Sequence, residues 1–123
     1  MELNWLAFIV GAIAAFMAGW AWYSPMVFGK GWAAGSKVEL GSASSMPVFA
    51  MVVQLIAVFL LSLVVSLTAL DAGLYTAIAA ILAAAAFVVS SGAFIHKSAY
   101  ALFVDGGYII LSGVIMIACH AIF

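Results

Sequence analysis

One face of the last apolar segment carries the side chains with the greatest potential for chemistry. Asp105, Tyr108, Ser112 and Cys119 fall within about 60° of one another if this segment is a helix. An ionisable group inside a membrane is costly, so it normally faces protein or water, and this face suits a proton or substrate site. The alternative is that Asp105 lies at the headgroups, pairs with Lys97 or caps the helix start, and does no chemistry. Its shallow depth favours this alternative.

The remaining candidate groups do not form a catalytic or metal-binding set. His96 and His120 belong at opposite membrane faces and cannot share a metal ion, which usually takes three or four protein ligands. Cys119 is the only cysteine, which excludes an internal disulfide. No serine has a histidine and an acid at suitable spacing, and no phosphate-binding loop or paired carboxylate is present. We therefore expect no enzyme activity, no metal and no cofactor.

Composition identifies the solvent around these residues. Apolar residues make up 70% of the 123 residues and charged residues 6%, whereas ordinary soluble chains carry about 25% charged residues. Such a chain cannot coat a water-facing surface, so most of it must face hydrocarbon, and the lipid bilayer is its first partner. A net charge of −1 without a basic patch argues against nucleic acid.

The pattern of apolar runs predicts an all-α membrane bundle. Lipid permits only helices or closed barrels, and the runs are continuous and about twenty residues long, which favours helices. Asn4 can cap the first helix, and Pro25 biases the residue before it away from helix. Residues 28–45 are rich in glycine and serine and are predicted to be a loop. We predict one membrane domain over residues 1–123, with four transmembrane helices at residues 4–24, 46–70, 74–95 and 100–122.

The lysines predict the orientation of this bundle. Lys30 and Lys37 lie in the first loop and Lys97 in the third, while the second loop and both termini have no lysine. Cytoplasmic loops carry the excess of basic residues. Both termini are therefore predicted to face the periplasm.

Small residues on two helices predict where the helices pack. In lipid, small side chains let helix backbones approach closely. The first helix has a stripe of Ala7, Gly11, Ala15 and Gly19, with Ile9, Ile13, Phe16 and Trp20 on the opposite side. The third helix has Ala80, Ala84 and Ser91 on one side, and Ile78, Leu82 and Val89 on the other. Packing within the chain is the favoured interpretation, and self-association is the alternative.

A resemblance to a known family rests on two motifs. The run from Trp22 to Trp32 resembles a WYSP-x-x-FGK-x-W signature, and the segment from Asp105 to Tyr108 resembles the D-x-G-Y start of a last helix. Together they are similar to the bacterial membrane protein family called domain of unknown function 1761. The resemblance implies a four-helix protein of the bacterial inner membrane and no assigned activity. The signature positions are Trp22, Tyr23, Ser24, Pro25, Phe28, Gly29, Lys30 and Trp32.

Each signature position also has a structural interpretation. Pro25 would end the first helix, and Gly29 would allow a positive φ. Trp22 and Tyr23 would anchor at the headgroups, and Lys30 would fix the orientation.

Three functions remain open from the sequence. The first is a non-enzymatic membrane protein, either an accessory subunit of a membrane-protein partner or a homo-oligomer. It is favoured because the sequence shows no catalytic set of residues and its loops are too short for a soluble domain. The second is a small transporter or channel that uses Asp105 as a polar site within the membrane, with Tyr108 and Ser112. The third is a membrane enzyme, which would need Asp105 and its neighbours to line a cavity.

Overall fold

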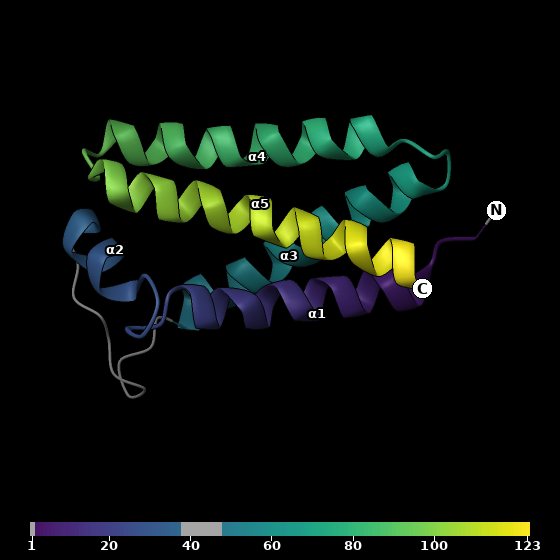
Figure 1. Cartoon of the computed structure of the whole chain (residues 1–123), viewed down its shortest axis with the longest axis horizontal. Coiled ribbons are helices and arrows are strands. Elements are labelled where there is room, and N and C mark those ends of the chain that lie inside the picture. The colour runs from purple at the N-terminus through teal and green to yellow at the C-terminus, as the bar shows by residue number, and fades with distance from the viewer. Residues whose placement is uncertain (1, 38–47) are drawn as a thin grey trace.

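The computed structural model describes residues 2–37 and 48–123, and its regular structure there is helical (Figure 1). The helices are α1 (Trp5–Trp22), α2 (Gly29–Ser36), α3 (Val48–Ala69), α4 (Leu74–Phe94) and α5 (Ala99–Ile122). The predicted start of the second long helix at residue 46, and the place of Pro47 in its first turn, lie outside the described residues.

Four of the described helices are long and apolar enough to cross a membrane. They have 18, 22, 21 and 24 residues, which corresponds to about 27–36 Å at 1.5 Å per residue, close to the roughly 30 Å of a hydrocarbon core. The all-α fold class and its four membrane helices, predicted from composition and apolar runs, are confirmed.

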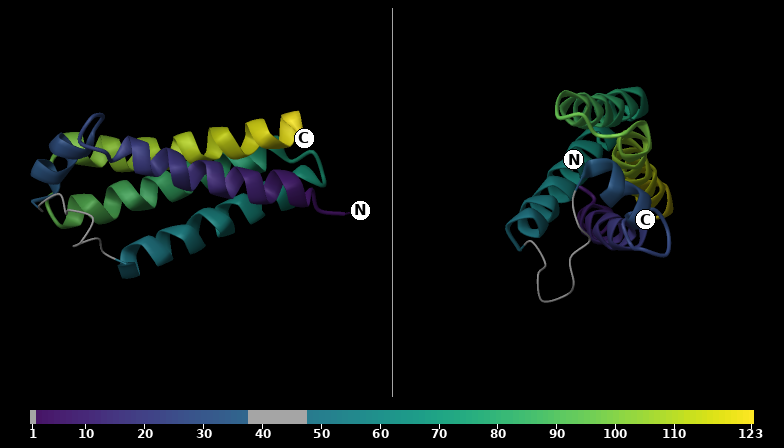
Figure 2. Two further views of the ribbon diagram at one scale, coloured as in Figure 1. Left: turned by 90° about the horizontal axis from the view of Figure 1, so that it is seen from below. Right: turned by 90° about the vertical axis from the view of Figure 1, so that its left-hand side faces the viewer.

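α5 is the central helix of the bundle. It packs against α1 on one side and α4 on the other, and it also touches α3 and α2. α1 packs on α3 as well, whereas α4 lies at the edge of the bundle beside α5 (Figures 1 and 2). Both termini lie at the same end as the α3–α4 connection, and α2 lies at the opposite end with the α4–α5 turn (Figure 1).

Local hydrogen bonds set the ends of α1 and α5. The Asn4 side chain accepts a hydrogen bond from the Ala7 amide at 3.1 Å, as the sequence predicts. Ser98 does the same for α5 by accepting from the Ala101 amide at 3.1 Å. The turn between α4 and α5 was predicted at residues 96–99; the helices flank residues 95–98, and His96 there has a φ of 63°. Ser98, and not Asp105, is therefore the cap of α5.

The prediction of a loop throughout residues 28–45 is wrong for α2. Glycines disfavour an isolated helix, but here they let the short helix approach α5. A Cβ on Gly31 would meet the Tyr100 ring, and a Cβ on Gly35 would meet the Ser98 hydroxyl and lie 2.9 Å from the Ala101 Cβ. The Ser98 amide also donates to the Gly35 carbonyl at 2.9 Å. Tertiary packing thus overrides the local preference.

The small-residue stripe of α1 forms the packed side of that helix. Ala7, Gly11, Ala15 and Gly19 are all buried, together with Ala12. Ile9, Ile13 and Trp20 are exposed to the surroundings of the bundle. Phe16 differs from the prediction, because its ring packs against the core formed by α1, α3, α4 and α5 instead of facing lipid.

The packed face of α4 differs from the prediction by one position. Its buried residues are Ala77, Ile81, Ala85 and Gly92. Ala80 and Ala84 flank this face and are half-buried, whereas Ser91 is exposed. On the side predicted to face away, Ile78 and Leu82 are exposed and Val89 is half-buried. The reason is that Ile81 fills the space above Gly113 of α5, so a large residue occupies the centre of this contact.

Candidate functional site

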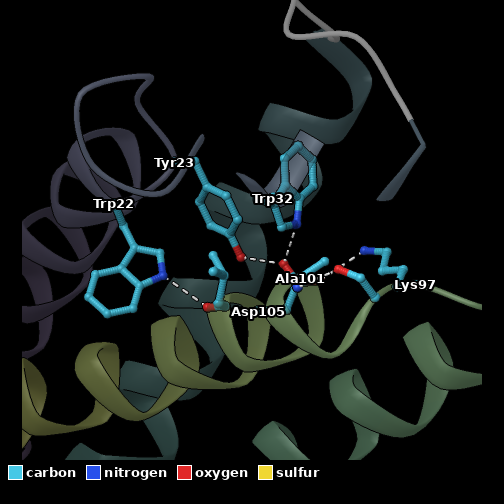
Figure 3. Close-up of polar contacts among 8 residues, drawn as sticks. Trp22, Tyr23, Trp32, Lys97, Ala101 and Asp105 are labelled. Atoms are coloured by element: carbon cyan, nitrogen blue, oxygen red, sulfur yellow. Dashed lines mark hydrogen bonds and ion pairs between the residues drawn. The ribbon is translucent and has the colours of Figure 1, made fainter. Parts of the chain in front are cut away.

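The Asp105 carboxylate receives hydrogen bonds from three segments of the chain. Its Oδ1 accepts from the Tyr23 hydroxyl at 2.6 Å and from the Trp32 indole N–H at 2.8 Å. Its Oδ2 accepts from the Lys97 ammonium at 2.8 Å. Figure 3 shows the side chains converging on this carboxylate from the end of α1, from α2 and from the α4–α5 turn. We call Tyr23, Trp32, Lys97 and Asp105 the Asp105 cluster.

The pairing of Asp105 with Lys97, one of the alternatives open from the sequence, is present in the structure. The Lys97 ammonium also lies 5.4 Å from the centroid of the Trp32 ring, within the range of a cation–π interaction. The Asp105 residue is 7% exposed, so the ion pair is largely shielded from solvent. A charge in such a place is tolerated because it is paired and hydrogen-bonded.

Tyr23 is held as a neutral donor. Burial raises the pKa of its phenol well above the usual value, and the hydrogen bond to Asp105 and the charge of that carboxylate raise it further. The ring also lies edge-on to Trp32 and to Tyr108, at centroid distances of 5.1 Å and 5.7 Å. Tyr23 therefore connects the exit of α1 to both α2 and α5.

Trp22 makes a separate contact with the same turn of α5. Its indole N–H donates to the Val104 carbonyl at 2.9 Å (Figure 3). The centroids of the Trp22 and Phe28 rings are 4.5 Å apart. Trp22 and Tyr23 were predicted to anchor at the headgroups; the structure shows in addition that the side chains of both residues bond to α5. An indole or phenol ends an apolar body in one polar group, and here that group finds a protein partner.

The turn between α1 and α2 explains two further signature residues. The amide of Gly29 donates to the Ser24 carbonyl at 2.8 Å, and that of Phe28 to the Trp22 carbonyl at 3.2 Å. Gly29 does not have a positive φ, contrary to the prediction. A Cβ there would meet the Tyr23 carbonyl and lie 2.7 Å from that of Ser24. Glycine is thus required by close backbone approach.

The remaining signature residues, Pro25 and Lys30, lie outside the Asp105 cluster. Pro25 lies in the turn after Trp22, where α1 has already ended. Lys30 is exposed on α2, at the same end of the bundle as Lys37 and Lys97.

The predicted polar face of α5 is buried along its length. Asp105, Tyr108, Ser112 and Cys119 all lie within the bundle. The Tyr108 hydroxyl donates to the Ala15 carbonyl of α1 at 2.8 Å. Ser112 is 1% exposed, and among the described residues its hydroxyl has no hydrogen-bond partner. This face therefore points to α1 and not to lipid.

A second polar contact joins α3 and α5 near the termini. The Ser66 hydroxyl lies 2.8 Å from His120 Nε2, and His120 Nδ1 lies 2.8 Å from the Met116 carbonyl. A carbonyl oxygen only accepts, so His120 Nδ1 carries a proton and donates to Met116. One turn away, Ser62 donates to the Phe8 carbonyl of α1 at 2.7 Å. The structure thus gives His120 a role in packing α3 on α5.

The sequence alone does not reveal that Tyr23 and Trp32 are partners of Asp105, or that Ser66 is a partner of His120. The first link had a signal. The aromatic donors belong to one motif of the resemblance and Asp105 to the other, and a buried carboxylate needs several donors. The Ser66–His120 contact had no signal in the sequence, because a serine on one helix does not specify which helix it faces.

The geometry limits the chemistry that these groups offer. Among residues 2–37 and 48–123, no three histidine, cysteine, aspartate or glutamate side chains are placed to hold a metal ion. His96 and His120 lie at the two ends of α5, as predicted. The Asp105 cluster is therefore a set of hydrogen bonds and one ion pair that holds the end of α1, α2 and the α4–α5 turn together.

Fold and site together define a multi-pass membrane protein closed at one end by a buried polar cluster. The chain matches a family model described as Protein of unknown function (DUF1761) over residues 6–121, and it belongs to that family. The resemblance inferred from the two motifs is thus confirmed. Neither a curated protein nor a solved structure matches the sequence.

Proposed function

We propose that this chain is a non-enzymatic membrane protein that acts by assembly, either as an accessory subunit of another membrane protein or as a homo-oligomer. The observation that carries the proposal is the occupation of both oxygens of Asp105 by donors of the same chain. A carboxylate that transports a proton or cation must exchange partners during its cycle. Here that exchange would break contacts that hold three segments together.

The surface of the bundle supports an assembly role. α4 packs only along one side, and large apolar residues such as Leu82 and Phe87 are exposed on it. In a membrane this surface is available to lipid or to another helix. The short connections of the described chain offer no room for a soluble domain.

We place the protein in the bacterial inner membrane, with both termini in the periplasm. Lys30, Lys37 and Lys97 belong to α2, its C-terminal cap and the α4–α5 turn, which lie at the end opposite the termini (Figures 1 and 2). Asp71, in the α3–α4 connection, lies at the end with the termini. This distribution fits cytoplasmic exposure of the lysine end.

Purification from native membranes tests the assembly proposal. We expect extraction in mild detergent, followed by native mass spectrometry, to recover either a defined oligomer or one stoichiometric membrane-protein partner. An isolated monomer with neither would contradict the proposal.

A small transporter or channel is the second candidate. The observation in its favour is the burial of Asp105, Tyr108 and Ser112 along one side of α5, between α5 and α1. A flux assay in proteoliposomes distinguishes the two candidates. Transport that is present in the native chain and lost in a folded Asp105→Asn variant would support this candidate over assembly.

A further inference from the structure

We propose that Ser112 binds an internal water molecule in the middle of the bundle. This inference goes beyond the proposed function, because it assigns a ligand to a residue that the Asp105 cluster does not use. The starting observation is the Ser112 hydroxyl, which is 99% buried and has no hydrogen-bond partner among the described residues. A buried polar group without a partner is costly, and ordered water commonly satisfies such groups.

The packing of α1 on α5 brings the Tyr108 hydroxyl toward the level of Ser112. Gly19 faces Tyr108 and Gly11 faces Met116. Ser112 lies midway between Tyr108 and Met116, so it is level with Ala15, which is midway between the two glycines. The Tyr108 hydroxyl donates to the Ala15 carbonyl, and the Tyr108 oxygen keeps a lone pair that can accept another hydrogen bond.

Ser112 and Tyr108 share the buried face of α5 and lie four residues, about one helical turn, apart. A buried water usually makes two to four hydrogen bonds. The Ser112 hydroxyl supplies one partner, and the Tyr108 oxygen is a second polar group on the same face.

One methionine in the interior reports on this water, and one exposed methionine serves as the reference. Met116 is one turn from Ser112 on the same face of α5 and is 0% exposed, whereas Met26 is 95% exposed in the turn after α1. A short X-ray pulse forms hydroxyl radicals from water where it stands. A fully buried methionine is therefore oxidised quickly only if a water molecule lies beside it.

The experiment is X-ray footprinting of the full chain in lipid nanodiscs, read by mass spectrometry. We expect Met116 to be oxidised in the native chain and its oxidation to fall at least fivefold in Ser112→Ala. Met26 should be oxidised equally in both. Ser66→Ala is the matched control, since it removes an equally buried serine hydroxyl from another contact and should leave Met116 oxidation unchanged.

The melting temperature of Ser112→Ala gives an independent test, because the change in Tm has opposite signs with and without a bound water. If Ser112 holds water, Ser112→Ala loses those hydrogen bonds and lowers the Tm. If the hydroxyl has no partner at all, the same change removes an unsatisfied group and raises the Tm. Absent Met116 oxidation in the native chain would overturn the proposal, as would oxidation that persists in Ser112→Ala or a raised Tm in that variant.

Discussion

Gly19 of α1 faces the ring and hydroxyl of Tyr108 on α5 so closely that a side chain on Gly19 has no room. A Cβ at this position would lie 2.7 Å from the Tyr108 oxygen and 2.8 Å from Cζ. The same tyrosine donates to the Ala15 carbonyl one turn earlier on α1. The missing side chain and this hydrogen bond together fix the distance between α1 and α5.

Gly19→Ala should therefore destabilise the bundle, by about 1–3 kcal/mol as an overpacked site. Unfolding in mixed micelles measures the change. Gly11→Ala is the matched control, because the nearest atoms to a Cβ on Gly11 lie at 3.4 Å, an ordinary contact. If Gly19→Ala and Gly11→Ala lowered the free energy of unfolding equally, Tyr108 would have to move aside without cost.

Asp105→Asn should lower stability strongly. Asparagine offers one acceptor oxygen in place of two and leaves the Lys97 ammonium without its ion-pair partner. Breaking a buried pair by removing one partner costs roughly 3–5 kcal/mol, and Lys97 is partly exposed, so we expect a value near the lower end. A double-mutant cycle with Lys97→Met measures the coupling, and additive effects of the two changes would contradict the importance of this pair.

Tyr23 should make the protein sensitive to alkaline pH. The pKa of its phenol is raised in the folded state from an ordinary value of 10.0, so the folded state holds this proton more tightly than the unfolded state. The resulting stability is present below about pH 10 and is lost as the pH rises further. Unfolding measured between pH 8 and 11 should show a decline that is weaker in Tyr23→Phe. Identical pH profiles for the two proteins would rule this out.

The orientation of the bundle is open to a direct measurement. Because the lysines gather at one end, a phosphatase fused after Phe123 should be active and a fluorescent protein fused there should be dark. A second pair of fusions in the α3–α4 connection at Asp71 should behave in the same way. A fluorescent, phosphatase-negative fusion at Phe123 would reverse the orientation.

Ser66 and His120 should be coupled in stability. Hydrogen bonds between membrane helices average about 0.6 kcal/mol in double-mutant cycles, and we expect a coupling of that order for Ser66→Ala with His120→Ala. Ser62→Ala with His120→Ala is the control cycle, because Ser62 bonds to Phe8 and not to His120. If the Ser62/His120 cycle gave a coupling as large as the Ser66/His120 cycle, the coupling would not come from the Ser66–His120 hydrogen bond.

The membrane architecture could be predicted from the sequence because hydrocarbon imposes one strong rule on every apolar run. The stripe on α1 could also be found, since glycine and alanine at every fourth position leave one side of a helix flat. The stripe on α4 was harder, because that helix is rich in alanine all round. There the buried face is set by Ile81 and by its partner Gly113 on another helix.

The Asp105 cluster could be predicted only in part. The chain position of Asp105 and the nearness of Lys97 in sequence indicated an ion pair. The aromatic donors could not be found in the same way, since Tyr23 and Trp32 are separated from Asp105 by 82 and 73 residues. α2 could not be predicted because its glycines disfavour a helix in isolation, and the segment is helical where it packs against α5.

The position of α5 at the centre of the bundle has a consequence for biosynthesis. A chain is made from its N-terminus, so α1, α3 and α4 enter the membrane, and α2 is synthesised, before their common partner exists. Until α5 is inserted, Tyr23 and Trp32 lack their acceptor, and the flat side of α1 has only α3 to pack against. A ribosome that stops before residue 99 therefore leaves behind an open set of helices with unpaired polar groups, which is the kind of substrate that membrane proteases remove.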